Sequence, residues 1–133
     1  MDIDRLKHSY AVANKMIELG QEKNLSTEQL DELFLLGYLH DIGYQYDKDN
    51  HAVAGAKVLK ENNYKYWQEV YYHGNPDSEY QSLYLDILNT ADMMIDKYGN
   101  DVGFDKRLED IKGRYGEESV PYTRCLKLVK KIK

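Results

Sequence analysis

The sequence predicts an all-α protein that folds as one compact bundle of about six to seven helices. Apolar residues recur at helical spacing along most of the 133-residue chain, and no two alternating stretches joined by a tight turn indicate a β-hairpin. Two prolines, 42% hydrophobic residues and 31% charged residues are typical of an ordinary globular chain. We therefore expect a single domain over residues 1–133.

The N-terminal third of the chain predicts two helices. Residues 3–19 place apolar side chains at roughly helical spacing, and Gly20 would end this helix. Ser26 and Gln29 form a capping-box signature, in which each residue bonds the backbone N–H of the other. This signature opens a second helix that we expect to run to His40.

The rest of the chain predicts further helices separated by turn signals. Gly43 would end the second helix, and Asn50 would cap a short third one. A helix at 64–72 should break at Gly74, and the most apolar helix is expected at 82–98. Weaker helices are predicted at 105–115 and 122–132.

Composition also excludes several function classes. A net charge of −5 provides no basic surface for nucleic acid or for an anionic membrane. Cys125 is the single cysteine, so no internal disulfide is expected and the thiol is interpreted as a small core residue. The charged N-terminus is not typical of a signal peptide, and no apolar run reaches the length of a membrane span. These features predict a cytoplasmic protein.

Several polar residues interrupt apolar helical stretches and form a candidate metal-ligand set. Asp92 lies inside an apolar helix, where an unpaired carboxylate would need a partner, a cation or solvent. A lone histidine on a helix is usually a core or rim residue, but neutral imidazoles together with carboxylates are ligands for first-row transition metals. The histidines of the chain are His8, His40, His51 and His73.

His40 and Asp41 are adjacent in the sequence, and two adjacent side chains can point into the same site only where a helix ends. Successive side chains in a regular helix point about 100° apart, so both could not easily face one ion. We expect Gly43 to let the backbone unwind just after them, so that the two side chains converge.

Five stretches together resemble the HD-domain superfamily of metal-dependent phosphohydrolases: "RLKHS", "LHDIGY", "HAVAGA", "YYHG" and "NTADMMID". The order His, His-Asp, Asp matches, and the motifs cover residues 5–98, with helices at 104–132 completing the bundle. The resemblance implies that one ion is held by His8, His40, Asp41 and Asp92. The extra pair His51 and His73 resembles dinuclear members, in which Asp41 would bridge to a second ion. Asp41 and His40 are the implied catalytic residues.

The resemblance implies hydrolysis of a nucleotide or other small phosphate ester or anhydride by metal-activated water. Two divalent ions are expected, iron or manganese first, with zinc, cobalt, nickel or magnesium as alternatives. One relative with this layout cleaves diadenosine tetraphosphate. The rival interpretations are a dinuclear iron oxygenase and a non-catalytic metal- or nucleotide-binding regulatory domain. The expected partner is a small phosphate compound, and no binding to nucleic acid or membranes is expected. The sequence leaves open whether the protein forms a homodimer.

Tyr44 departs from a common spelling of this superfamily, "HDIGK", where a lysine is available for phosphate. A phenol can donate a hydrogen bond but carries no positive charge. Substrate cations would then come from elsewhere, and Arg5 lies one turn before His8 on the same predicted helix. We therefore expect Arg5, Tyr44 and Lys97 to be the substrate-binding residues.

Overall fold

The computed structural model describes residues 2–132, and within that range it contains seven α-helices, one short 3-10 helix and no β-strand. This confirms the predicted all-α bundle. Met1 and Lys133, the ends of the predicted domain, lie outside the described residues. No helix within 2–132 is both long and apolar enough to cross a lipid bilayer. The elements are α1 (Ile3–Glu22), α2 (Thr27–Leu39), η1 (Ile42–Gln45), α3 (His51–Glu61), α4 (Trp67–Tyr72), α5 (Leu83–Met94), α6 (Gly103–Tyr115) and α7 (Val120–Ile132).

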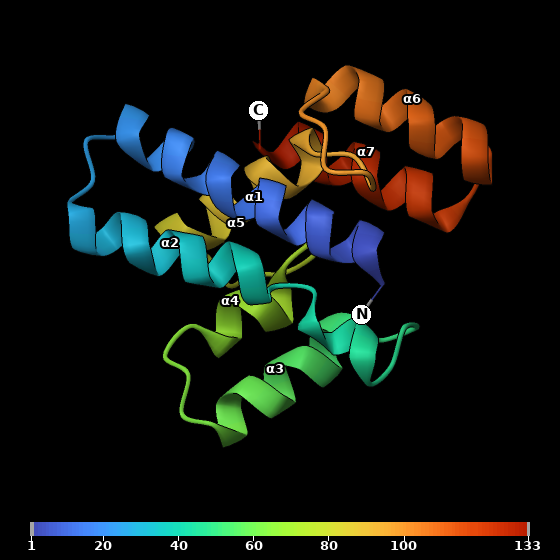
Figure 1. Cartoon of the computed structure of the whole chain (residues 1–133). Coiled ribbons are helices and arrows are strands. Elements are labelled where there is room, and N and C mark those ends of the chain that lie inside the picture. Colours follow the sequence, from blue (N-terminus) through green and yellow to red (C-terminus); the bar gives the residue numbers. More distant parts are fainter. Residues whose placement is uncertain (1, 133) are drawn as a thin grey trace.

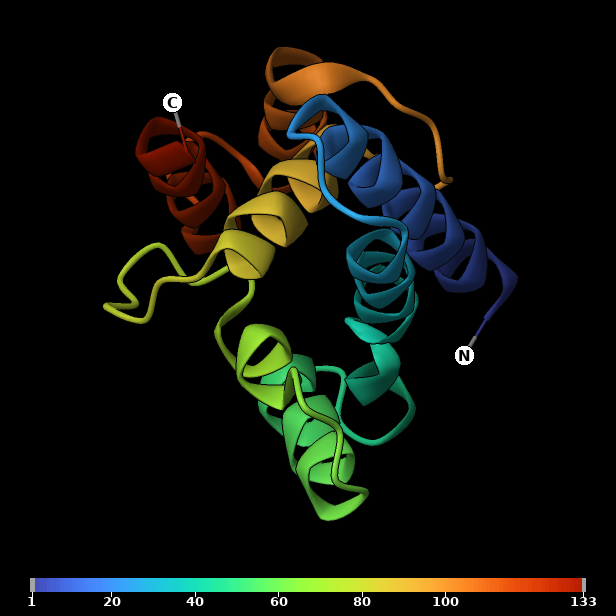
Figure 2. The same cartoon turned by 90° about the vertical axis from the view of Figure 1, so that its left-hand side faces the viewer.

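Helix α5 links three pairs of helices. Helices α1 and α2 lie side by side in antiparallel orientation, and both contact α5 (Figure 1). Helices α3 and α4 form a second pair, which reaches α5 through α4. Helices α6 and α7 form a third pair, which packs against α5 away from α3 and α4 (Figure 2). The end of α5 is therefore surrounded by elements from distant parts of the sequence.

Two apolar clusters hold these pairs together. In the main core, Val12, Met16, Leu33, Leu36 and Leu88 of α1, α2 and α5 are fully buried. Burial of each such side chain stabilises the fold by roughly 1.5–3 kcal/mol. The smaller cluster joins α5 to the α6–α7 pair through Met93, Leu108, Ile111, Leu128 and Val129. The α6–α7 pair therefore docks on α5 through a separate apolar contact.

Of the predictions for the start of α2 and the end of α1, the first is confirmed and the second is wrong. The capping box is confirmed, because the Gln29 N–H donates to Ser26 Oγ at 3.2 Å and the Ser26 N–H donates to Gln29 Oε1 at 3.0 Å. The prediction that Gly20 ends α1 is wrong, because the helix continues to Glu22. An added Cβ at Gly20 would lie 2.7 Å from the side chain of Leu30. Gly20 is therefore a close-packing position between α1 and α2.

The helix predicted at 82–98 is shorter in the structure and ends at Met94. Ile95 is extended, with φ −103° and ψ 125°, and it pairs with Asp101 in an isolated bridge. Asp96 consequently lies outside the helix, where its carboxylate accepts backbone N–H groups and its carbonyl accepts hydrogen bonds from the Gly99 N–H and from His8 of α1. Elsewhere, the helix predicted from 64 begins at Trp67, that from 105 at Gly103 and that from 122 at Val120.

Candidate metal centre

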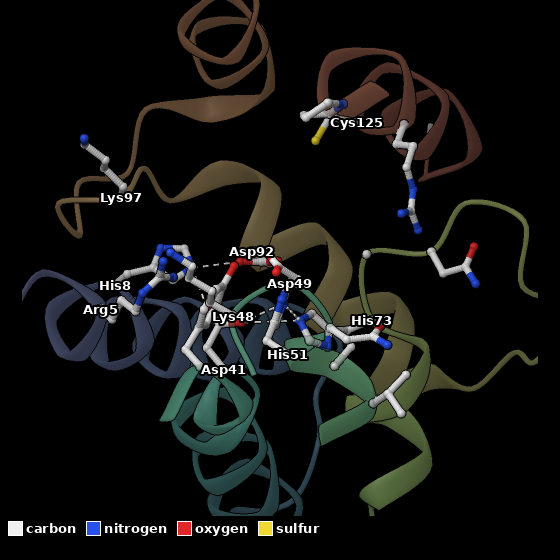
Figure 3. A pocket seen from close by; sticks show the side chains of 18 of the residues that line it. Arg5, His8, Asp41, Lys48, Asp49, His51, His73, Asp92, Lys97 and Cys125 are labelled. Atoms are coloured by element: carbon white, nitrogen blue, oxygen red, sulfur yellow. Dashed lines mark hydrogen bonds and ion pairs between the residues drawn. The ribbon is translucent and has the colours of Figure 1, made fainter. Parts of the chain in front are cut away.

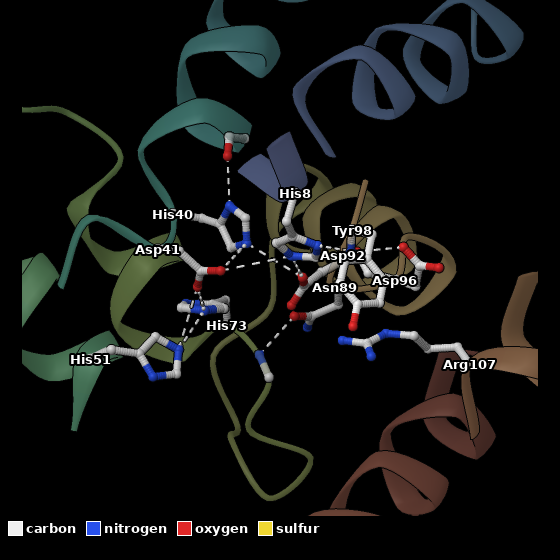
Figure 4. Close-up of polar contacts among 12 residues, drawn as sticks. His8, His40, Asp41, His51, His73, Asn89, Asp92, Asp96, Tyr98 and Arg107 are labelled. Carbon is white, nitrogen blue, oxygen red and sulfur yellow. Dashed lines mark hydrogen bonds and ion pairs between the residues drawn. The ribbon is translucent and has the colours of Figure 1, made fainter. Parts of the chain in front are cut away.

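Six side chains from separate parts of the fold meet beside α5 (Figure 4). They come from α1, the end of α2 and the residue after it, the start of α3, the end of α4, and α5 itself. Their ring nitrogens and carboxylate oxygens form three overlapping groups, in each of which the atoms lie within 4.8 Å of one another. The structure thus brings together the residues that sequence reasoning selected as metal ligands: His8, His40, Asp41, His51, His73 and Asp92.

The carboxylate of Asp41 lies between two pairs of histidines. Its Oδ2 is 3.7 Å from Nε2 of His8 and 3.3 Å from Nε2 of His40. Its Oδ1 is 3.5 Å from Nε2 of His51 and 3.4 Å from Nε2 of His73. Each oxygen of one carboxylate therefore faces a different imidazole pair, which is the arrangement that a bridging ligand requires.

Asp92 completes one side of this cluster. Its Oδ1 is 2.8 Å from Nε2 of His8 and 3.3 Å from Nε2 of His40. The same two imidazoles thus face both Asp92 and Asp41. On the other side of Asp41, the Nε2 atoms of His51 and His73 lie 3.3 Å apart. The cluster accordingly consists of a four-residue half with two carboxylates and a three-residue half, and the two halves share Asp41.

Backbone carbonyls set the orientation of three of the imidazole rings. A carbonyl oxygen can only accept, so each Nδ1 that contacts one carries the proton and donates it. When the ring is neutral, as a metal ligand must be, each Nε2 then has a lone pair that faces the cluster. The three donor–acceptor pairs are His8 with the Asp96 carbonyl at 2.9 Å, His40 with Gly37 at 2.6 Å and His73 with Val70 at 2.5 Å.

These lone pairs and carboxylate oxygens form a set that fits a metal ion. The Nε2 of His40 is fully buried, and no hydrogen-bond partner within residues 2–132 reaches it. A buried acceptor that faces other acceptors is unfavourable unless a proton or another cation lies between them. Imidazole nitrogen together with carboxylate oxygen is a usual ligand set for divalent transition metals. The chemistry of the cluster therefore suits such ions.

The pKa values in the cluster follow the same charge pattern. Burial opposes the charged form of His40, but the carboxylates of Asp41 and Asp92 outweigh it and raise the pKa of His40 well above its usual range. Burial also opposes the charges of the two aspartates, yet His40 holds their pKa values well below the usual range. Burial, followed by the neighbouring His73, lowers the pKa of His51 to about 4. Ionised carboxylates and neutral His51 are the forms that ligate metal.

His40 and Asp41 converge because the helix stops between them. His40 has helical angles (φ −59°, ψ −30°), whereas Asp41 leaves the helix with φ −103° and ψ 14°. The predicted unwinding role of Gly43 is wrong, because α2 ends at Leu39 and the chain has already left the helix at Asp41, before Gly43. An added Cβ at Gly43 would instead lie 1.7 Å from the carbonyl oxygen of His51 and 2.7 Å from the amide nitrogen of Gly55. Gly43 thus allows η1 to pack against α3, which brings His51 to the site.

The sequence matches the HD domain family over residues 5–132, which is nearly the whole chain. The protein belongs to the HD domain family. Comparisons with curated proteins and with solved structures found no significant match. HD domains are a superfamily of metal-dependent phosphohydrolases that bind divalent ions, and the histidine–aspartate cluster of this chain could hold such an ion.

Three side chains of this HD domain are stacked at the edge of the cluster. The rings of Tyr44 and His51 are nearly parallel, with centroids 4.1 Å apart and planes 10° apart. The guanidinium carbon of Arg5 lies 3.3 Å from the centre of the Tyr44 ring. At these distances Arg5 and His51 must occupy opposite faces of the phenol. Burial raises the pKa of Tyr44 to about 12, so its hydroxyl stays protonated at neutral pH.

The cluster opens into a cavity of about 620 Å³ (Figure 3). Arg5, Tyr44 and Lys97, the residues predicted to bind substrate, all line it. Its charged lining comprises three aspartates and five basic residues, the latter being Arg5, Lys48, Lys97, Arg107 and Arg124. The basic side chains therefore outnumber the acidic ones here, although the whole chain has a net charge of −5. Such a lining favours an anionic ligand.

Besides Lys48, which precedes α3, sequence reasoning did not select Arg107 and Arg124. Each belongs to an amphipathic helix near the C-terminus, where a charged residue is indistinguishable from one on a solvated face. Cys125 was predicted to be a core residue, and it packs in a half-buried position against the α6–α7 cluster. It also lines the cavity, and burial raises the pKa of its thiol.

Proposed function

We propose that this HD domain is a phosphohydrolase that holds two divalent transition-metal ions and cleaves a nucleotide or other small phosphate ester or anhydride. The observation that carries the proposal is the position of Asp41. One of its oxygens faces His8 and His40, and the other faces His51 and His73. This division supports two adjacent ions that share Asp41.

In this proposal the two halves of the cluster hold one ion each. The first ion would be held by the half that contains both carboxylates, and the second by the half that contains His51. The imidazole-rich set supports iron or manganese, with zinc, cobalt, nickel or magnesium as alternatives. The ligands are His8, His40, Asp41 and Asp92 for the first ion, and His51, His73 and Asp41 for the second.

Such a pair of ions, when bound, supplies a water of lowered pKa as nucleophile and neutralises phosphate oxygens. The protein's own residues fix the geometry. Asp41 stays ionised, because His40 lowers its pKa, and so it is available as a bridging ligand. His40 is held by its hydrogen bond to the Gly37 carbonyl, which keeps Nε2 pointing into the cluster. These two residues would therefore do most to position the reacting groups.

Substrate phosphate would be oriented by three residues of the cavity wall. The Tyr44 ring supports the Arg5 guanidinium at the edge of the cluster, which supports Arg5 as the cation used in place of a lysine after "HDIG". The Tyr44 hydroxyl stays protonated and can donate a hydrogen bond to a phosphate oxygen. Lys97 lies on the same cavity and supplies a further positive charge. Phosphoryl transfer depends mainly on such positioning and charge neutralisation.

Elemental analysis of the purified protein, coupled to a screen for phosphate release, tests the proposal. The screen should contain mononucleotides, cyclic nucleotides, dinucleoside polyphosphates and simple phosphate esters. We expect two equivalents of metal and turnover of at least one substrate class. Oxygen consumption by a diiron form without phosphate release would instead identify an oxygenase. Bound metal without either activity would identify a regulatory domain.

A further inference from the structure

Arg107 is a partly buried cation on the wall of the cavity that belongs to α6. Its side chain is only 16% exposed, and its Nε is buried without a hydrogen-bond partner among residues 2–132. The nearest carboxylate oxygen, on Asp110, lies 4.0 Å from NH1, at the limit of an ion pair. The guanidinium points from α6 toward Asn89 and Asp92 (Figure 4). The Nε itself is covered by protein, so a ligand in the cavity would meet the NH1 and NH2 groups at the end of this side chain.

Arg124 brings a second positive charge to the same cavity from α7. Within the described chain it forms no hydrogen bond or ion pair. The charge of Arg124 helps to lower the pKa of Asp77, but the Asp77 carboxylate is already paired with Lys127. Arg124 is exposed and therefore free to turn toward a ligand.

Neither arginine belongs to the metal-ligand set, although the Arg107 guanidinium points toward one of its members, Asp92. Helices α6 and α7 contribute none of the six residues of the candidate metal centre. Figure 3 shows Cys125, the neighbour of Arg124 on α7, across the cavity from Asp41 and His51. Two like charges that face one cavity repel each other, and this repulsion is relieved when an anion lies between them.

We propose that Arg107 and Arg124 form a second anion-binding subsite, which takes an anionic group of the substrate other than the phosphoryl group that reacts. The inference rests on the proposed phosphohydrolase function, because it assigns the reacting group to the metal centre. It narrows the substrate class to small compounds that carry two separated anionic groups, such as two phosphates or a phosphate and a carboxylate. A cavity of about 620 Å³ has room for such a molecule beyond a single phosphate.

Paired non-hydrolysable ligands test this subsite without any need for turnover. Butane-1,4-bisphosphonate carries two anionic groups, and butylphosphonate has the same chain with only one. Isothermal titration calorimetry of the metal-containing protein gives the ratio of the two affinities. We expect the bisphosphonate to bind more tightly to wild type, and this ratio to fall about tenfold or more in R107Q or R124Q. R107K and R124K should recover part of the preference, since they keep the charge.

The control is K106Q, which removes an exposed charge from α6 beside Arg107 but outside the cavity. Its ratio should stay at the wild-type value. The subsite would be overturned if the ratio of the two affinities stayed unchanged in R107Q and R124Q, provided that the unfolding temperatures show both variants to be folded. Because Arg124 is exposed, R124Q keeps the test decisive even if R107Q unfolds. A protein that keeps the arginine-dependent preference but cleaves no phosphate compound would overturn the proposed function and leave the subsite standing.

Discussion

The phenol ring of Tyr44 lies parallel to the imidazole of His51, with ring centroids 4.1 Å apart. Arg5 covers the other face of the phenol at 3.3 Å. Tyr44 therefore contacts both a candidate metal ligand and a candidate substrate cation. This stack links the position where the chain departs from the common "HDIGK" spelling to the chemistry of the site.

Replacement of Tyr44 by leucine should raise KM for a phosphate substrate more than it lowers kcat. The ring would no longer hold the Arg5 guanidinium, and a cation–π contact contributes about 0.5–2 kcal/mol, or about 2- to 30-fold in affinity. Steady-state kinetics of Y44L and Y44F check this. Y44F keeps the ring but loses the hydroxyl, so its KM should rise less than that of Y44L. Equal losses in the two variants would show that the hydroxyl, and not the stack, matters.

Asp41→Asn should remove both metal ions and abolish hydrolysis. The amide has no charge and cannot bridge two cations as a carboxylate can. Metal content by elemental analysis and phosphate release are the measurements. Asp31→Asn on α2 is the matched control, because Asp31 is exposed and outside the cluster. Two equivalents of metal together with normal turnover in D41N would contradict the bridging role.

His51→Ala should remove one ion and retain the other. His51 contacts Asp41 Oδ1 and His73, whereas the half of the cluster with two carboxylates does not depend on it. Elemental analysis should therefore fall from two equivalents of metal to about one. His8→Ala alters the half of the cluster with two carboxylates, so this variant should lose the first ion and retain the second. Simultaneous loss of both ions in H51A would argue against two separable sites.

Gly43→Ala should destabilise the protein and impair metal binding. The added methyl would lie 1.7 Å from the His51 carbonyl oxygen, so η1 and α3 must move apart. Overpacking of this kind costs about 1–3 kcal/mol in the free energy of unfolding, measured by urea denaturation. Gly113→Ala is the control, because no atom lies within 4 Å of an added methyl there. In that variant a helix-interior glycine becomes alanine, which should stabilise by about 0.5–1 kcal/mol.

We expect Glu32 to stabilise the folded protein to an extent that depends on pH. Its carboxylate accepts hydrogen bonds from Tyr66 at 2.6 Å and Tyr84 at 2.9 Å, and these lower its pKa below the ordinary 4.5. A lowered folded-state pKa means that the stabilisation is present above pH 4.5 and is lost as the pH falls through the folded-state pKa.

The glutamine variant measures this contribution. The free energy of unfolding of E32Q should be lower than that of wild type near pH 7 by about 1 kcal/mol or less, because solvent screens the charge of this partly exposed group. The difference between the two proteins should shrink as the pH falls below 4.5. A difference that stays constant down to pH 3 would show that the charge of Glu32 is not involved.

Much of the helical architecture could be predicted because its signals act within one or two turns. The Ser26 capping box, the apolar spacing of α2 and α5 and the break at Gly74 depend on local backbone and side-chain contacts. The errors arose where a distant segment intervened. Gly20 does not end α1, because it is a close-packing position against α2. Helix α5 ends earlier than predicted, because Ile95 pairs with Asp101.

The helical class, the family and the six chemically suited residues could be predicted from the sequence, since residue type and motif order are properties of the chain. The packing of the helices, in contrast, divides the oxygens of Asp41 between two imidazole pairs and requires Gly43 to lack a side chain. It also brought Arg107 and Arg124 to the cavity wall. These relationships join helices far apart in sequence, and their distances are set by how the helix pairs pack around α5, which no local spacing encodes.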